Sequence, residues 1–157
     1  MTREEKFMQE AIKLSEKGMR NNEGGPFGCV IVKNDKIIGR GNNQVNATND
    51  PTAHAELVAI REACNNLGTF LLEGCEVFTS CEPCPMCLGA IYWARAGKIY
   101  FANNHKDAAQ IGFDDSMIYQ EINSDLKDRK IPMINLGREA AQKAFIEWSQ
   151  KKNKTIY

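Results

Sequence analysis

Residues 79–87 read TSCEPCPMC and contain three of the six cysteines in the chain. A short run typical of a strand, Cys75–Thr79, precedes the cysteines, and a helical pattern over Cys84–Arg95 contains the last two. Because Cys84 and Cys87 are three positions apart, a helix that contains both brings the two thiols to one face. The stretch therefore predicts a strand followed by a helix whose first turn offers two thiolates to one ion.

A second polar motif, His54-Ala55-Glu56, lies at the expected start of another helix, Ala53–Leu67. Asp50-Pro51-Thr52 supplies a cap and a first-turn proline for this helix. Residues two positions apart in the middle of a helix point about 200° apart. His54 and Glu56 can therefore face one point only if the helix begins there.

Together the two motifs predict a catalytic zinc site. His54, Cys84 and Cys87 supply three ligands, and the fourth tetrahedral position stays open for water, as in catalytic zinc sites. Zinc lowers the pKa of bound water to roughly 7, which makes a hydroxide nucleophile available. Glu56, beside the metal and not on it, is the expected proton shuttle. The combination of His-x-Glu with Pro-Cys-x-x-Cys resembles the signature of zinc nucleobase deaminases.

Cys81 keeps a different kind of site open. It lies three residues before Cys84 and could close a four-ligand structural zinc site, with Cys75 as a further candidate. The protein would then be a non-catalytic zinc module.

The remaining pattern predicts one α/β domain over residues 1–157, with three layers, α/β/α, around a central mixed sheet. Residues 42–49 and 105–115 are expected as loops, and Ala141, Phe145 and Trp148 as a core-facing helical stripe. The other expected elements are a helix over Glu4–Met19, a hairpin of Phe27–Val32 and Lys36–Gly41, a strand over Lys98–Ala102, a possible last strand over Ile131–Leu136 and a helix over Arg138–Lys151.

Composition limits the function classes. Twenty Lys and Arg balance twenty Asp and Glu, so no basic excess favours a nucleic-acid partner. The charged N-terminus has no signal-peptide pattern, and apolar runs are too short to span a membrane. We expect a cytoplasmic protein, where six cysteines indicate metal binding before disulfides.

Several longer motifs resemble the small bacterial guanine deaminases of the cytidine-deaminase superfamily. These are GGPFG at 24–28, NDPTAHAE at 49–56, TSCEPCPMCLGAIYWA at 79–94, GFDDS at 112–116 and the terminal Tyr157. The resemblance implies a cytidine-deaminase-like fold, one zinc ion per subunit and conversion of guanine to xanthine and ammonia. The zinc motif is shared with tRNA adenosine deaminases and with cytosine and adenine deaminases, which stay open as alternatives.

The same resemblance implies a set of substrate contacts. It assigns Phe27 to stacking on the base, Asn43 and the Ala55 backbone amide to its edge, and Asp115 and Tyr157 to the rest of the pocket. Asn42 is the rival of Asn43, and Asp114 is the rival of Asp115. The resemblance also implies a homodimer in which the segment 138–157 crosses to the partner, so Tyr157 could act in either subunit.

Overall fold

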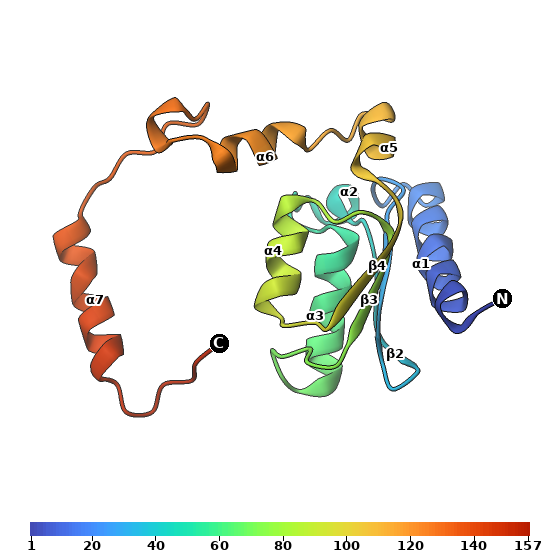
Figure 1. Ribbon diagram of the computed structural model, residues 1–157, viewed down its shortest axis with the longest axis horizontal. Coiled ribbons are helices and arrows are strands. Elements are labelled where there is room, and N and C mark those ends of the chain that lie inside the picture. The colour runs from blue at the N-terminus through green and yellow to red at the C-terminus, as the bar shows by residue number, and fades with distance from the viewer. The chain divides into compact units, whose positions relative to one another are not determined.

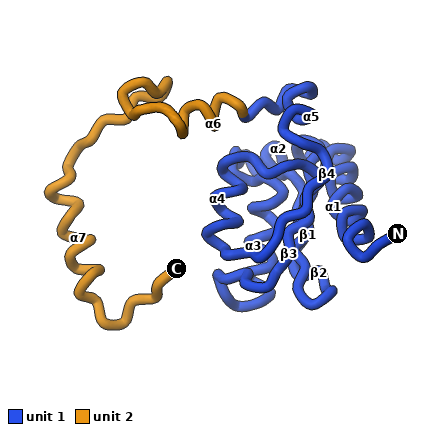
Figure 2. The backbone as a smooth tube through the Cα atoms, in the orientation of Figure 1, with its two compact units in different colours: residues 1–115 blue, residues 116–157 orange.

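The computed structural model describes residues 1–157. The chain divides into two compact units, Met1–Asp115 and Ser116–Tyr157 (Figure 2). That both units belong to one domain over residues 1–157 stays a prediction.

The first unit holds every strand of the molecule and five of the helices. In chain order its elements are α1 (Arg3–Arg20), β1 (Gly28–Lys33), β2 (Lys36–Asn42), α2 (Val45–Thr48), α3 (Ala55–Leu67), β3 (Glu76–Cys81), α4 (Pro85–Trp93), β4 (Lys98–Asn103) and α5 (His105–Gln110). The predicted hairpin, the strands expected over Cys75–Thr79 and Lys98–Ala102, and the three longer helices of this unit are confirmed.

The four strands form one mixed sheet in the order β2-β1-β3-β4. β1 pairs antiparallel with both β2 and β3, whereas β3 and β4 run parallel. Helix α1 covers one face of the sheet, and α3 and α4 cover the other (Figure 1). The predicted three-layer α/β/α arrangement around a mixed sheet is therefore confirmed.

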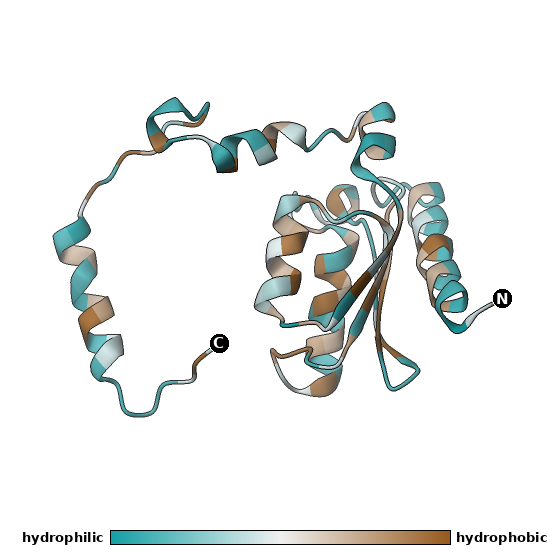
Figure 3. Ribbon diagram, viewed as in Figure 1, coloured by the Kyte–Doolittle hydropathy of each residue, from teal (hydrophilic) through white to brown (hydrophobic).

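The two central strands are buried on both faces, which divides the core into two clusters. Cys29 and Ile31 of β1 face α3 and α4, while Val30 of the same strand lies with Phe78 in the cluster that α1 covers. Alternate side chains of a strand point to opposite faces, so both faces of β1 need apolar residues. Apolar residues accordingly mark the strands and the helices packed on them (Figure 3).

A glycine on β2 sets how closely α3 approaches the sheet. A Cβ added to Gly41 would lie 2.1 Å from the carbonyl oxygen of Ala55, in the first turn of α3. No side chain fits there, so only glycine lets this turn rest directly on the strand. The contact fixes the start of α3, where His54 and Glu56 lie.

Two segments predicted as loops contain short helices. Val45–Thr48 forms α2 inside the expected loop 42–49, and His105–Gln110 forms α5 inside the expected loop 105–115. α5 begins because the Asn104 side chain accepts the amide hydrogens of Lys106 and Asp107, and Asp107 caps the Asn104 amide in return. This capping box stabilises a helix too short to show an apolar period.

The second unit contains α6 (Ser116–Asn123), a 3-10 turn η1 (Leu126–Asp128) and α7 (Arg138–Gln150). The predicted strand over Ile131–Leu136 is wrong: no strand forms there, and Leu136 is 92% exposed. The expected core-facing stripe of α7 is exposed as well, with Phe145 72% exposed. A helical repeat of apolar residues predicts that this face of the helix is buried, but it does not show whether the same chain or another chain covers it.

No helix of the chain combines the length and the apolar character that crossing a membrane requires.

Candidate metal centre and active site

His54 stands at the N-cap of α3, outside the helix. A turn precedes it, because the backbone amide and the hydroxyl of Thr52 both donate to Asp50 Oδ1, at 2.8 and 2.7 Å. The predicted helix start at Ala53 is therefore two residues early, and Asp50 caps this turn instead of the helix. With φ −71° and ψ 156°, His54 has extended backbone and turns its ring away from the helical path.

The two cysteine ligands come from the start of α4. Cys84 is the N-cap with extended backbone, Pro85 occupies the first helical position and Cys87 completes the first turn. Proline suits this position because its missing N–H would find no partner in the helix. The prediction that two helices begin at the metal ligands is thus confirmed: α3 begins after His54 and α4 begins after Cys84.

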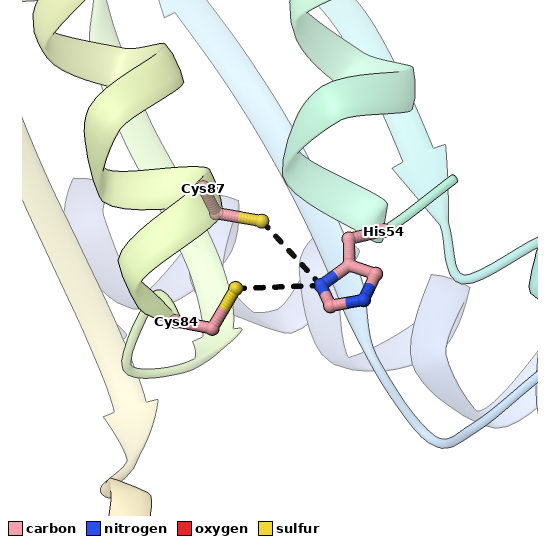
Figure 4. A group of neighbouring side chains, drawn as sticks. All are labelled: His54, Cys84 and Cys87. Carbon is pink, nitrogen blue, oxygen red and sulfur yellow. Dashed lines mark hydrogen bonds between the residues drawn. The ribbon is translucent and has the colours of Figure 1, made fainter. Parts of the chain in front are cut away.

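The three predicted metal ligands form one group (Figure 4). His54 Nδ1 lies 3.5 Å from Cys84 Sγ and 3.6 Å from Cys87 Sγ. A tetrahedral zinc ion with ordinary Zn–S and Zn–N bonds needs an N to S separation of about 3.6 Å. One imidazole and two thiols at this spacing fit zinc, and the three side chains leave a fourth position open for water.

The thiols of this group already differ in acidity. The Cys87 thiol donates a hydrogen bond to Cys84, which lowers the pKa of Cys84 to about 4, and His54 adds to this effect. Donating that hydrogen bond, together with burial, raises the pKa of Cys87. A site with one thiolate already formed is prepared for a cation.

Glu56 lies next to the group without belonging to it. It is in the first turn of α3 and only 6% exposed. The Thr79 hydroxyl of β3 donates a hydrogen bond of 2.9 Å to its Oε1. Burial raises the pKa of Glu56 above the ordinary range of a carboxyl group. A carboxyl group that readily gains and loses a proton suits a proton carrier.

The two asparagines that the sequence could not separate have different surroundings. The Asn42 amide donates to Glu23 Oε2 at 2.6 Å, and its side chain lies where a Cβ of Gly18 would be. Asn43 is buried, and its Oδ1 accepts the amide hydrogen of Val45 at 3.1 Å. Asn42 thus holds the chain to the end of α1, which leaves Asn43 as the better candidate for a ligand contact.

Phe27 and Ala55 flank the same region. The Phe27 carbonyl accepts the Asn43 backbone amide hydrogen at 3.0 Å, so the backbones of these two residues are held together. Ala55 is fully buried at the first position of α3. An N–H at that position has no carbonyl partner within its own helix and can serve a ligand.

The carboxyl-terminal candidates divide between the two units. Asp115 closes the first unit and is half-buried, whereas its rival Asp114 is exposed. Burial raises the pKa of Asp115, and its carboxyl also interacts electrostatically with Cys84. Tyr157 is the last residue of the second unit.

The alternative ligand Cys81 is not in the metal group. Its Sγ lies 3.7 Å from the carbonyl oxygen of Asn104, at the end of β3. Burial raises its pKa to about 11, as expected of a neutral thiol. The geometry therefore favours the open three-ligand site over a closed structural one.

Comparison with known proteins agrees with this geometry. Residues 1–103 match the cytidine and deoxycytidylate deaminase zinc-binding region. The chain belongs to this deaminase family. It is accordingly a zinc-dependent deaminase, and the His-Cys-Cys group is the donor set in it that suits zinc.

Relatives within the deaminase family differ in how much of the chain they match. A guanine deaminase of Bacillus subtilis is 49% identical over 98% of both chains. The crystal structure of a guanine deaminase from Bacillus subtilis superposes with a TM-score of 0.95, at 49% identity over 98% of each chain. A tRNA-specific adenosine deaminase of Aquifex aeolicus is 42% identical, but over only 62% of this chain and 64% of its own.

Sequence reasoning missed two residues of this deaminase site. Thr79, the partner of Glu56, looked like an ordinary strand residue, and nothing local in the sequence marks it. Phe113, whose ring lies edge-on to Phe27 with centroids 4.9 Å apart, belongs to the motif GFDDS at 112–116, but the sequence assigns it no contact of its own. Its position two residues before Asp115 is the signal that could have drawn attention to it.

Proposed function

We propose that this protein hydrolyses guanine to xanthine and ammonia, with zinc held by His54, Cys84 and Cys87. The observation that carries the proposal is the buried carboxyl of Glu56 beside an open three-ligand metal group. The choice of guanine is supported by the Bacillus subtilis guanine deaminase, whose likeness extends over 98% of this chain.

Zinc bound at this site supplies the activation of a water molecule for attack on the carbon that bears the amino group. Glu56 takes a proton from that water and delivers it to the neighbouring ring nitrogen of guanine. A new C–O bond forms at C2. Glu56 then carries the second proton to the amino group, the C–N bond breaks, and ammonia leaves. Water and guanine thus account for every atom of xanthine and ammonia.

Two helix starts assist this chemistry. His54 precedes α3 and Cys84 precedes α4, so the positive ends of both helix dipoles lie at the metal group. They favour the thiolate ligands and the negative charge that develops on the attacking oxygen. Thr79, on strand β3, holds the Glu56 carboxyl in place through its hydrogen bond.

We assign the base to a pocket with five contacts. An aromatic face stacks on any base, so Phe27 contributes binding affinity but does not distinguish guanine from other bases. Guanine presents N–H donors that a carboxylate such as Asp115 accepts, and acceptors that an amide can reach. The proposed contacts are Phe27, Asn43, the Ala55 backbone amide, Asp115 and Tyr157.

We also propose a homodimer in which residues 138–157 pack against the partner subunit. Neither α6 nor α7 buries a residue, and the exposed apolar side chains include Ile134 and Phe145. The first unit exposes Tyr92 on α4 and Phe101 on β4 as well. Apolar surface of this extent is typical of an interface. Sedimentation equilibrium should give twice the chain mass of 17.6 kDa, and a monomer at micromolar concentration would reject the dimer.

The same proposal covers all 157 residues as one functional deaminase domain, since the Bacillus subtilis guanine deaminase matches 98% of this chain. We also propose a cytoplasmic location, because metal-ligating thiols need a reducing compartment.

Adenosine in tRNA is the second candidate substrate. The Aquifex aeolicus tRNA-specific relative supports it, but its match leaves out more than a third of the chain. The formal charge of zero also gives little attraction to a phosphate backbone.

Ammonia release from guanine, adenine, cytosine, cytidine and tRNA, tested side by side, separates the candidates. Release from guanine alone supports the proposal. Release from tRNA with silence on free bases overturns it in favour of tRNA editing.

A further inference from the structure

The segment from Asn104 to Asp115 links β4 to the proposed substrate pocket. It begins with the capping box of α5 and ends with Phe113 and the two candidate carboxylates. Phe113 contacts Phe27, and Asp115 interacts electrostatically with Cys84 and His105. The position of this segment therefore decides where Phe113 and Asp115 stand relative to the base.

A single carboxylate holds the first residue of α5. Glu82 Oε2 accepts the backbone amide hydrogen of His105 at 3.0 Å and lies 2.8 Å from its ring nitrogen Nδ1. A carboxylate can only accept hydrogen bonds, so Nδ1 carries the proton in this pair. His105 is one of two histidines in the chain, and the other is the metal ligand His54.

Glu82 is itself placed by the sheet and the metal loop. Its backbone amide donates to the Asn103 carbonyl at 2.7 Å, which continues the parallel pairing of β3 and β4 past the last residue of β3. Two residues later comes Cys84, a proposed zinc ligand. Glu82 therefore connects the metal loop to the segment that carries the pocket residues.

The other end of the segment is fixed by aromatic contact. The Phe113 amide donates to the Ala108 carbonyl at 2.9 Å, which folds the chain back after α5. The Phe113 ring then meets Phe27 at an interplanar angle of 90°. A Cβ on Gly25 would lie 2.8 Å from the Phe113 ring and 2.9 Å from the Phe27 ring. The two rings therefore occupy space that a side chain at position 25 would need.

We propose that Glu82 is a positioning residue: by holding His105 it keeps segment 104–115 in the place where Phe113 contacts Phe27 and Asp115 meets the base. The inference rests on the proposed guanine deaminase function. Glu82 acts through His105 and the segment, and it does not touch the substrate.

The exposure of the pair distinguishes positioning from general support of the fold. The side chain of His105 is 46% exposed and that of Glu82 is 30% exposed. Exposed ion pairs add little to global stability. Removing this pair should therefore loosen the segment while the sheet, α3 and α4 stay folded.

The first experiment compares Glu82→Ala, Glu82→Gln, His105→Ala and the double variant Glu82→Ala/His105→Ala. Lys106→Ala, an exposed neighbour on α5, is the matched control. Loss of both hydrogen bonds should raise the KM for guanine about tenfold in Glu82→Ala, and His105→Ala, which keeps the backbone amide bond to Glu82, should raise it less. The double variant should lose no more than Glu82→Ala, and the KM of Glu82→Gln, which keeps an acceptor, should lie between those of the wild type and Glu82→Ala. Zinc content, kcat and Tm should stay near those of the wild type.

The second experiment measures amide hydrogen exchange in the same proteins without substrate. The amides of Ala108 and Phe113 should exchange about tenfold faster in Glu82→Ala, since their hydrogen bonds depend on the fixed segment. The amide of Leu88 in α4 should be unchanged.

An unchanged KM in Glu82→Ala with active wild type overturns the inference alone, as does unchanged exchange in the segment. A fall in Tm or zinc content that accounts for the loss also overturns it, because the role is then structural. A wild type with one zinc per chain that neither binds nor converts guanine rejects the proposed function. If Glu82→Ala still shows faster exchange in segment 104–115 in that case, Glu82 holds the segment, but the inference that it positions the segment for guanine is overturned.

Discussion

The Thr79 hydroxyl donates a hydrogen bond of 2.9 Å to Glu56 Oε1, and both side chains are buried. Thr79 belongs to the central strand β3, whereas Glu56 lies in the first turn of α3. A buried strand in the middle of the sheet therefore sets the direction of the proposed proton carrier. A carboxyl group that must reach both water and base needs such a fixed orientation.

Replacing Thr79 should reduce turnover without removing the metal. Thr79→Val keeps the volume and deletes the donor, so we expect kcat to fall about tenfold, with zinc content unchanged. Thr79→Ser keeps the hydroxyl and should retain most of the activity. Steady-state kinetics and metal analysis of the two variants check this prediction. Equal activity of Thr79→Val and wild type would show that the hydrogen bond does not matter.

The cysteines should separate into metal ligands and a bystander. Cys84→Ser and Cys87→Ser should lose most of the bound zinc and nearly all activity. Cys81→Ser should keep both, since the Cys81 thiol lies outside the metal group. Zinc per chain, measured by atomic emission, decides the matter. Loss of zinc and of folded structure in Cys81→Ser would restore the closed structural site.

The neighbouring aspartates provide a matched pair. Asp115→Asn should raise the KM for guanine by about tenfold or more, because an amide cannot replace a carboxylate that accepts two N–H groups. Asp114→Asn should change little, since Asp114 is exposed. Both variants should keep one zinc per chain. An equal loss in Asp114→Asn would move the contact by one residue.

Much of the first unit could be predicted because local signals and packing agree there. The sequence spacing indicated that His54, Cys84 and Glu56 meet at two helix starts, and the structure has both starts. The predicted helix start at Ala53 is two residues early, because Asp50 caps the turn before the helix. Periodicity alone could not distinguish a cap of a turn from a cap of a helix.

Other features depend on contacts that no local pattern records. α5 forms through a four-residue capping box, so it has no apolar period to detect. The hydrogen bonds from Thr79 to Glu56 and from His105 to Glu82 join residues more than twenty positions apart. The apolar run Ile131–Leu136 suggested a strand, but a strand needs a neighbour to pair with, and none is supplied.

Removing the C-terminus should test the role of Tyr157. Deletion of residues 154–157 should leave zinc bound and reduce guanine turnover at least about a hundredfold, because the pocket stays open to water. Tyr157→Phe is the milder companion and should retain binding by stacking. Full activity of the truncated protein would remove Tyr157 from the site.

Mixing subunits shows which subunit Tyr157 serves. The truncated chain keeps Glu56, and a full-length Glu56→Gln chain keeps Tyr157, so each is inactive alone. If Tyr157 completes the partner's pocket, refolding equal amounts together should restore about a quarter of the wild-type rate, since half of the dimers are hybrids. No recovery in proven hybrid dimers would place Tyr157 in its own subunit.

The most direct test of zinc-dependent deamination through Glu56 is the yield of xanthine and ammonia from guanine. Wild type and Glu56→Gln, each with one zinc per chain, are compared in the same assay. We predict one ammonia per xanthine with wild type and a rate about a thousandfold lower with Glu56→Gln. No product from the zinc-loaded wild type, or an equal rate from both proteins, would contradict the account.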